Sequence, residues 1–205
     1  MTKKNKKLKT ILRSFVKAGG ILRMSEAVRL GIHRRDLYKL RDEGKLEMIS
    51  RGLFRLKEVP EPSLPDFIPA AKKVPQGVIC LISALAFHEI TTQIPHFVYL
   101  AIPRNAYKPT ILHPPMRYFW YSEKLLTTGV EKHRIDGFTF KIFNIEKTLV
   151  DCVKFRNKIG MDIVLEALKM YWRRRKTNIN KLMDYAKLFH VEHILRPIME
   201  TIISD

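Results

Sequence analysis

The chain has 205 residues, of which 46% are hydrophobic, and a formal net charge of +18. This length and apolar content fit a packed protein of one large or two small domains. The absence of any run of about 18 apolar residues argues against a membrane span, and the basic excess favours a polyanionic partner such as nucleic acid.

The positive charge is concentrated in the first quarter of the chain. Residues 1–57 hold 17 of the 38 Lys and Arg residues and 5 of the 20 Asp and Glu residues, a net charge of +12 against +6 for the other 148 residues. The lysines of residues 1–9 are not followed by the apolar segment of a secretory signal, and Cys80 and Cys152 each lie in an apolar stretch. We therefore expect a cytoplasmic protein with two buried thiols and a cationic N-terminal domain.

The N-terminal segment predicts a winged helix-turn-helix. An amphipathic helix is expected over residues 6–17, ended by Gly19-Gly20, and a second helix over residues 25–29 with Ser25 as its N-cap. Gly31 permits the turn because glycine reaches positive φ without steric penalty. A third helix over residues 33–43 and a small β-hairpin complete the predicted domain, residues 1–57.

The third helix is the predicted recognition helix. At 100° per residue, Leu37 and Leu40 bracket the core direction, and His33 falls on the same side as a capping or packing residue. Six side chains are the candidate DNA contacts: Arg34, Arg35, Tyr38, Lys39, Arg51 and Arg55. Arg35 is the first candidate for a base contact, because Arg pairs bidentately with guanine O6 and N7. The others are expected on phosphates or on a thymine methyl edge, with the two hairpin arginines flanking Gly52 at the wing.

Residues 58–75 contain five of the eleven prolines, which predicts a semi-rigid linker that runs into a short helix near residues 66–73. Beyond it, residues 76–205 predict a second, α+β domain in which strands come first and helices follow. Strands are expected at residues 78–82, 97–102, 118–121, 130–135 and 138–143, with Ser83 capping a short helix after the first of them and Asp136-Gly137 forming a hairpin turn.

After Asn144, a plausible N-cap, the apolar period changes from two to 3.6. Helices are expected from residue 145, over residues 161–172 after Gly160, and around residues 181–189 and 191–203, with Pro197 kinking the last. By spacing, Glu146 and Asp151 are expected on a solvated helix face.

The residue patterns of common catalytic sites are missing or weak. The Glu-x-Lys element of many nucleases occurs only as Glu43-Gly44-Lys45, in a turn and without clustered carboxylates. His190 and His193 have no third ligand at matching spacing, and the chain contains neither a phosphate-binding glycine motif nor a nucleophile motif. The sequence therefore predicts a binding protein with no metal or cofactor, and argues against an enzyme.

Several segments together resemble the AbiEi family, the antitoxins of type IV abortive-infection toxin–antitoxin pairs. In the first domain the resemblance is carried by residues 31–32, 37–44 and 50–56, and in the second by residues 83–88, 93–95, 101–104, 146–152, 156–160 and 165–168. The most specific piece is residues 146–152, Glu-Lys-Thr-Leu-Val-Asp-Cys, together with residues 156–160 and 165–168. Phe54 stands where the family commonly has a wing tyrosine, and the last 30 or so residues match weakly.

The resemblance implies a winged helix that represses the protein's own operon at an operator with inverted repeats. It also implies a C-terminal domain that antagonises a nucleotidyltransferase toxin in phage defence. The two proteins need not bind each other directly for this, so a stable complex is not assumed. Two alternatives stay open: a winged-helix transcription factor that responds to a small ligand, and a nuclease or nucleotidyltransferase delivered to DNA by the winged helix.

Overall fold

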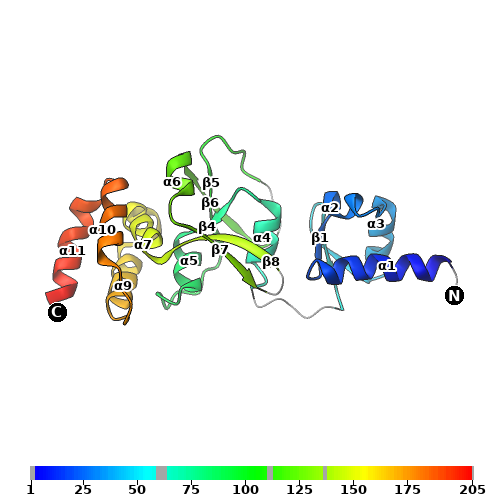
Figure 1. The fold of residues 1–205 in the computed structure, drawn as a ribbon, viewed down its shortest axis with the longest axis horizontal. Coiled ribbons are helices and arrows are strands. Elements are labelled where there is room, and N and C mark those ends of the chain that lie inside the picture. Colours follow the sequence, from blue (N-terminus) through cyan, green and yellow to red (C-terminus); the bar gives the residue numbers. More distant parts are fainter. Residues whose placement is uncertain (1–2, 59–63, 110–112, 136–137, 205) are drawn as a thin grey trace. The chain divides into compact units, whose positions relative to one another are not determined.

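The computed structural model describes residues 3–58, 64–109, 113–135 and 138–204, with side chains from residue 7 onward. The chain forms two compact units. The first comprises Met1–Pro75, Pro109–Pro115 and His133–Phe140, and the second Gln76–Lys108, Met116–Lys132 and Lys141–Asp205. Figure 1 shows the elements of both units along the chain.

The first unit begins with three helices and a small sheet in the order of a winged helix-turn-helix. Its elements are α1 (Lys3–Lys17), β1 (Ile21–Arg23), α2 (Met24–Arg29), α3 (Arg34–Asp42), β2 (Leu46–Ser50) and β3 (Leu53–Leu56). The strands are antiparallel in the order β1-β3-β2, so that the wing is the short turn between β2 and β3. The predicted helices and hairpin are confirmed, while β1 was not predicted.

The core of this domain lies between the helices and one face of the sheet. Phe15 of α1, Leu37 and Leu40 of α3, and Phe54 of β3 belong to one buried cluster. Val16, the neighbour of Phe15, is 59% exposed, so α1 turns Phe15 inward. Gly31 has φ +80°, which confirms the predicted left-handed turn between α2 and α3.

The predicted N-cap of α2 is wrong, whereas His33 takes one of its two expected roles at the start of α3. Ser25 lies inside α2, because Arg23 is the N-cap and its backbone N–H donates to the Glu26 carboxylate at 2.8 Å. His33 is the N-cap of α3, but its side chain is exposed and makes no capping hydrogen bond. The core position that the wheel gave to His33 is filled by the buried Ile32, which comes directly before the helix.

The proline-rich segment contains the predicted short helix, α4 (Phe67–Lys73), and this helix is well packed. Ile68 clusters with Ile21, Leu53 and Phe138, all within the first unit. Ile21 and Leu53 alternate along their strands with residues of the helical core, so they lie on the opposite face of the three-stranded sheet.

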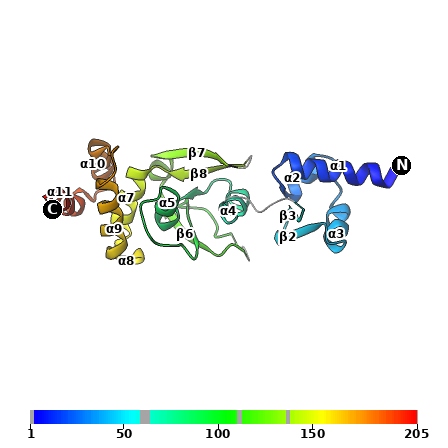
Figure 2. The same ribbon diagram turned by 90° about the horizontal axis from the view of Figure 1, so that it is seen from below.

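The second sheet has five strands in the order β6-β5-β4-β8-β7: β4 (Val78–Ile79), β5 (Val98–Pro103), β6 (Met116–Tyr121), β7 (Val130–Ile135) and β8 (Phe138–Phe143). Strand β5 is antiparallel to β4 and parallel to β6, and β4 is parallel to β8. In Figure 2, β6 and β7 lie at opposite edges of this sheet. The predicted turn at Asp136-Gly137 lies outside the described residues.

The predicted strand at residues 78–82 is shorter than expected. It ends at Ile79, and α5 (Leu81–Phe87) begins two residues later at Leu81, which has φ +48°. Ser83 is therefore inside the helix and is not its cap. Its buried hydroxyl donates to the Phe97 carbonyl oxygen at 3.1 Å and accepts from the Tyr99 N–H at 3.0 Å, which fixes the start of β5 against α5.

Helices complete the second unit: α6 (Glu123–Thr127), α7 (Ile145–Lys154), α8 (Arg156–Ile159), α9 (Met161–Trp172), α10 (Ile179–Leu188) and α11 (Glu192–Ser204). Asn144 caps α7 as predicted, because its side chain accepts from the Lys147 N–H at 2.9 Å. Pro197 lies within α11. Cys80 and Cys152 are free, buried thiols in the core shared by the sheet and these helices. The order of strands and then helices confirms the α+β class.

Helix α7 corrects the expectation for Asp151. This side chain is fully buried, and the Lys147 ammonium, also fully buried, lies 2.6 and 2.5 Å from its two carboxylate oxygens. The rings of Tyr121, Phe143 and Phe189 surround the ammonium at 4.8, 4.1 and 4.0 Å. Desolvation raises the pKa of Asp151 and lowers that of Lys147, while each charge opposes the shift of the other.

Candidate nucleic-acid interface

The first turn of α3 carries two exposed arginines, Arg34 and Arg35. Leu37 and Leu40 hold the inner face of the helix in the core, so Arg34 and Arg35 project into solvent. Within the described residues, no carboxylate lies within ion-pair distance of either guanidinium. Both groups are therefore available at the N-terminal end of the helix, which is the end that reads bases in helix-turn-helix proteins.

In the second half of α3, the positive charge of Arg41 is paired with a carboxylate. The Arg41 guanidinium donates to the Asp42 carboxylate at 2.7 and 2.9 Å and lies 5.0 Å from the centre of the Tyr38 ring. The Tyr38 ring also packs edge-on against Phe54 of β3, with centroids 5.7 Å apart. Tyr38 is still 38% exposed, so its position is fixed while one edge of its ring stays accessible.

Lys39 borders a groove between α1 and α3 whose apolar floor includes Leu8 and Ile11. Lys7 and Asp36 also line this groove and form an ion pair, with 2.7 Å between Nζ and the carboxylate oxygen. The hydrogen bond from Lys7 lowers the pKa of Asp36 from its usual value of 3.8, against a smaller opposing effect of burial. The pair links α1 to the predicted recognition helix.

Replacing Lys7 with Met is expected to lower stability modestly, by about 0.2–1 kcal/mol near pH 7, the usual range for exposed ion pairs. The folded-state pKa of Asp36 is lowered, so the pair stabilises the protein above the unfolded-state pKa and loses this effect as the pH falls through the folded-state value. The stability difference between wild type and Lys7→Met, measured by urea unfolding, should therefore shrink as the pH falls below the unfolded-state pKa and Asp36 becomes protonated. A difference that does not change as the pH falls would mean that the loss comes from packing.

The wing is a tight turn at Arg51 and Gly52, and Gly52 has φ +75°. The carbonyl oxygen of Gly52 accepts from the Met24 N–H at 2.8 Å, and that of Arg51 accepts from Lys73 Nζ at 2.8 Å. These bonds tie the turn to the start of α2 and to the end of α4. The Arg51 side chain itself is exposed, which suits a contact with the DNA backbone.

Arg55 has a different setting from the other five candidates. It pairs with Glu47 of β2 at 2.8 Å, and it alternates along β3 with Phe54, whose side chain enters the helical core. Arg55 thus lies on the sheet face that carries Leu53, away from α3. The structure groups four candidates on α3 and places Arg51 on the wing, whereas Arg55 is separate from them. Its contact with DNA stays a prediction.

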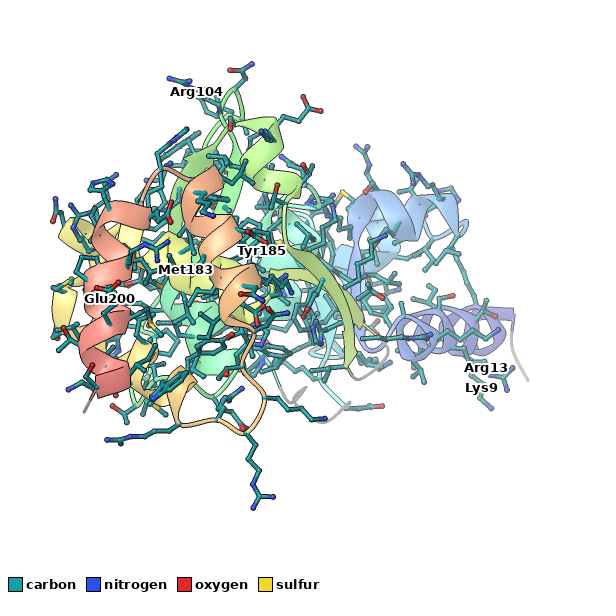
Figure 3. The ribbon with its side chains drawn as sticks, turned by 60° about the vertical axis from the view of Figure 1, so that its left-hand side comes forward. Lys9, Arg13, Arg104, Met183, Tyr185 and Glu200 are labelled. Carbon is teal, nitrogen blue, oxygen red and sulfur yellow. The ribbon has the colours of Figure 1, made fainter. Side chains whose placement is uncertain are left out.

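Helix α1 adds a cationic stripe that the sequence interpretation missed. Lys9, Arg13 and Lys17 follow one another at intervals of four residues, which places them on one side of the helix, and all three are exposed. Figure 3 shows Lys9 and Arg13 projecting from the same side of α1. The i, i+4 spacing of these cations is the sequence signal that predicts such a stripe.

The described residues contain no cluster of three or more His, Cys, Asp or Glu side chains able to hold a metal ion. Glu43 and Lys45, the ends of the Glu-x-Lys element, pair with each other at 3.2 Å. None of the described helices is both long enough and apolar enough to span a bilayer.

Comparison with known proteins finds a family match for the N-terminal domain. The crystal structure of the RV2827C protein from Mycobacterium tuberculosis is similar in fold, with a TM-score of 0.53 and 12% sequence identity over 85% of this chain and 70% of that chain. No curated protein matches the chain significantly. The family model described as "Transcriptional regulator, AbiEi antitoxin" matches residues 9–57, the span that holds α2, α3, the wing and all six predicted DNA contacts. Residues 9–57 of this chain are therefore similar to the transcriptional regulators of the AbiEi antitoxin family.

Proposed function

We propose that the chain is a DNA-binding autorepressor and the antitoxin of a type IV pair, and that it antagonises a nucleotidyltransferase toxin encoded beside it. The family match over residues 9–57 supports regulation through DNA. The resemblance of residues 146–152 and of the other segments of the second domain supports the antitoxin role. In this proposal the chain has no catalytic activity of its own.

The observation that carries the proposal is the pair of free guanidinium groups on the first turn of α3. Arg35 points directly away from the core residues Leu37 and Leu40, so it enters the major groove when the helix lies there. Arg34, Tyr38 and Lys39 then contact phosphates on the flanks of the helix. Arg51 meets the DNA backbone from the wing, and the α1 stripe supplies further cations for the phosphates.

The experiment that tests this proposal compares binding to the DNA upstream of the protein's own gene with binding to unrelated DNA. Salt near 0.15 M is required, because a protein with a net charge of +18 binds any duplex at low ionic strength. We expect a preference of roughly 10³-fold or more for the upstream DNA, at a site with two inverted half-sites. Equal binding to both DNAs would remove the repressor proposal.

Replacing Arg35 with Ala is expected to weaken operator binding by about 1–3 kcal/mol and to relax specificity at one base pair. Arg41→Ala is the matched control, because it removes the same side chain from the same helix but from a site already paired with Asp42. The readout is the dissociation constant for operators substituted one base pair at a time. A control variant that loses as much specificity as Arg35→Ala would contradict this orientation of α3.

The antitoxin role has a separate readout. When the adjacent toxin is expressed, Arg35→Ala should still restore growth, because the substitution lies in the DNA-binding domain. A variant that loses repression but keeps rescue would separate the two activities. Loss of both, in a variant that remains folded, would mean that rescue depends on DNA binding.

A further inference from the structure

Strand β6 is an open edge of the five-stranded sheet. It pairs with β5 on one side along its whole length, from Met116 to Tyr121, and no described strand pairs with its other side. Figure 2 shows this position at the edge of the sheet. The indole ring of Trp120 is 47% exposed there. An open strand edge offers a row of backbone N–H and C=O groups to another extended chain.

Beside this edge, two cations are held against a row of aromatic rings. The Arg117 guanidinium lies 5.8 Å from the centre of the Phe97 ring and 5.9 Å from that of Tyr99, and it donates to the Tyr99 hydroxyl at 3.4 Å. Tyr99 stacks on Phe119, with centroids 5.9 Å apart. The Lys158 ammonium lies 5.8 Å from the Phe119 ring. The row therefore connects one cation to the other.

Both cations are exposed and lack a carboxylate partner within the described residues. Their aromatic contacts restrict the side chains before any ligand arrives, which reduces the entropy lost on binding. Charged residues on an edge strand often serve only to prevent aggregation. Prevention of aggregation does not by itself account for this arrangement. Trp120 leaves apolar surface exposed on the same strand, and Lys158 belongs to α8 and not to the edge strand.

We propose that β6 and the two cations bind an extended acidic segment of a partner protein by strand addition. The backbone of the segment would pair with the open side of β6. Acidic side chains at alternate positions would then lie on the sheet face that carries Arg117 and Phe119 and meet the two cations. A polypeptide fits this site better than a nucleic acid, because only a polypeptide repeats donors and acceptors at the spacing of a strand. The inference does not depend on the proposed DNA-binding function.

The test uses the full chain and fluorescent, end-blocked peptides. One peptide alternates Glu and Val over seven residues, and a second has Pro in place of every Val, so that it keeps the charge but cannot pair along a strand. We expect fluorescence anisotropy to show that the first peptide binds at least about tenfold more tightly than the second. Arg117→Glu and Lys158→Glu should each weaken binding of the first peptide by a similar factor. Lys169→Glu, at an exposed site on α9, is the matched charge control and should leave binding within about twofold.

Three results would overturn the proposal. Equal binding of the two peptides would exclude strand addition. If Lys169→Glu lost as much affinity for the first peptide as Arg117→Glu and Lys158→Glu, the binding would be due to general charge attraction. Tighter binding of a single-stranded oligonucleotide that Arg117→Glu abolishes would make the surface a nucleic-acid site. Circular dichroism and thermal melting of each variant show whether the domain is folded. Peptide binding and operator binding are measured separately, so a failure of one is distinguishable from a failure of the other.

Discussion

Replacing Lys147 with Met should lower the free energy of unfolding by about 3–5 kcal/mol, because it leaves the Asp151 carboxylate buried without its partner. Asp151 has no exposed surface, and Lys147 donates to both of its oxygens. The aromatic rings around Lys147 cannot replace this cation. Urea unfolding at pH 7, followed by circular dichroism, measures the loss.

The double variant Lys147→Met with Asp151→Leu is the control. Replacing both members of a buried pair by apolar side chains of similar size is often neutral or stabilising, so the double variant should recover most of the loss. In the single variant, burial raises the folded-state pKa of Asp151 above the unfolded value, so its deficit should shrink as the pH falls and the carboxyl group protonates. A double variant as unstable as the single one would show that Lys147 matters through packing rather than charge.

Gly129→Ala should cost about 2–5 kcal/mol, because strain and steric overlap add at this position. Gly129 has φ +70°, and an added Cβ atom would lie 2.8 Å from Cβ of Lys147. The Gly129 carbonyl oxygen also accepts from the Asn144 N–H at 2.8 Å, so movement of the glycine would disturb the capped start of α7.

Gly31→Ala provides the comparison. Gly31 has a similar φ of +80°, but an added Cβ atom would meet nothing within 4 Å. Its substitution should therefore cost only the conformational strain, about 1–2 kcal/mol. The difference between the two variants in urea unfolding measures the overlap with Lys147. Equal losses would mean that the backbone near Gly129 relaxes freely.

The local signals of the chain were sufficient for the helices and hairpin of the winged helix, though not for β1, and for most of the second domain. Leu37 and Leu40 fixed the inner face of α3, Gly31 marked the turn before it, and Asn144 marked the start of α7. Each of these signals acts within a few residues through helical periodicity, positive φ or a capping hydrogen bond. The concentration of charge in the first 57 residues also pointed to the domain that matches a family of transcriptional regulators.

Tertiary structure alone decided the environment of the polar side chains. Periodicity placed Asp151 on a polar face, but α7 is enclosed by the sheet and other helices, and Lys147 offsets the cost of burying the carboxylate. Strand pairing set the face of Arg55 and left β6 at an edge, where one row of aromatic rings contacts both Arg117 and Lys158, which is 41 residues further along the chain. The sequence determined which segments are helices, strands and cationic surfaces, because those properties depend on neighbouring residues. Which charges are paired, buried or free depends on elements distant in sequence, and only the folded chain brings those together.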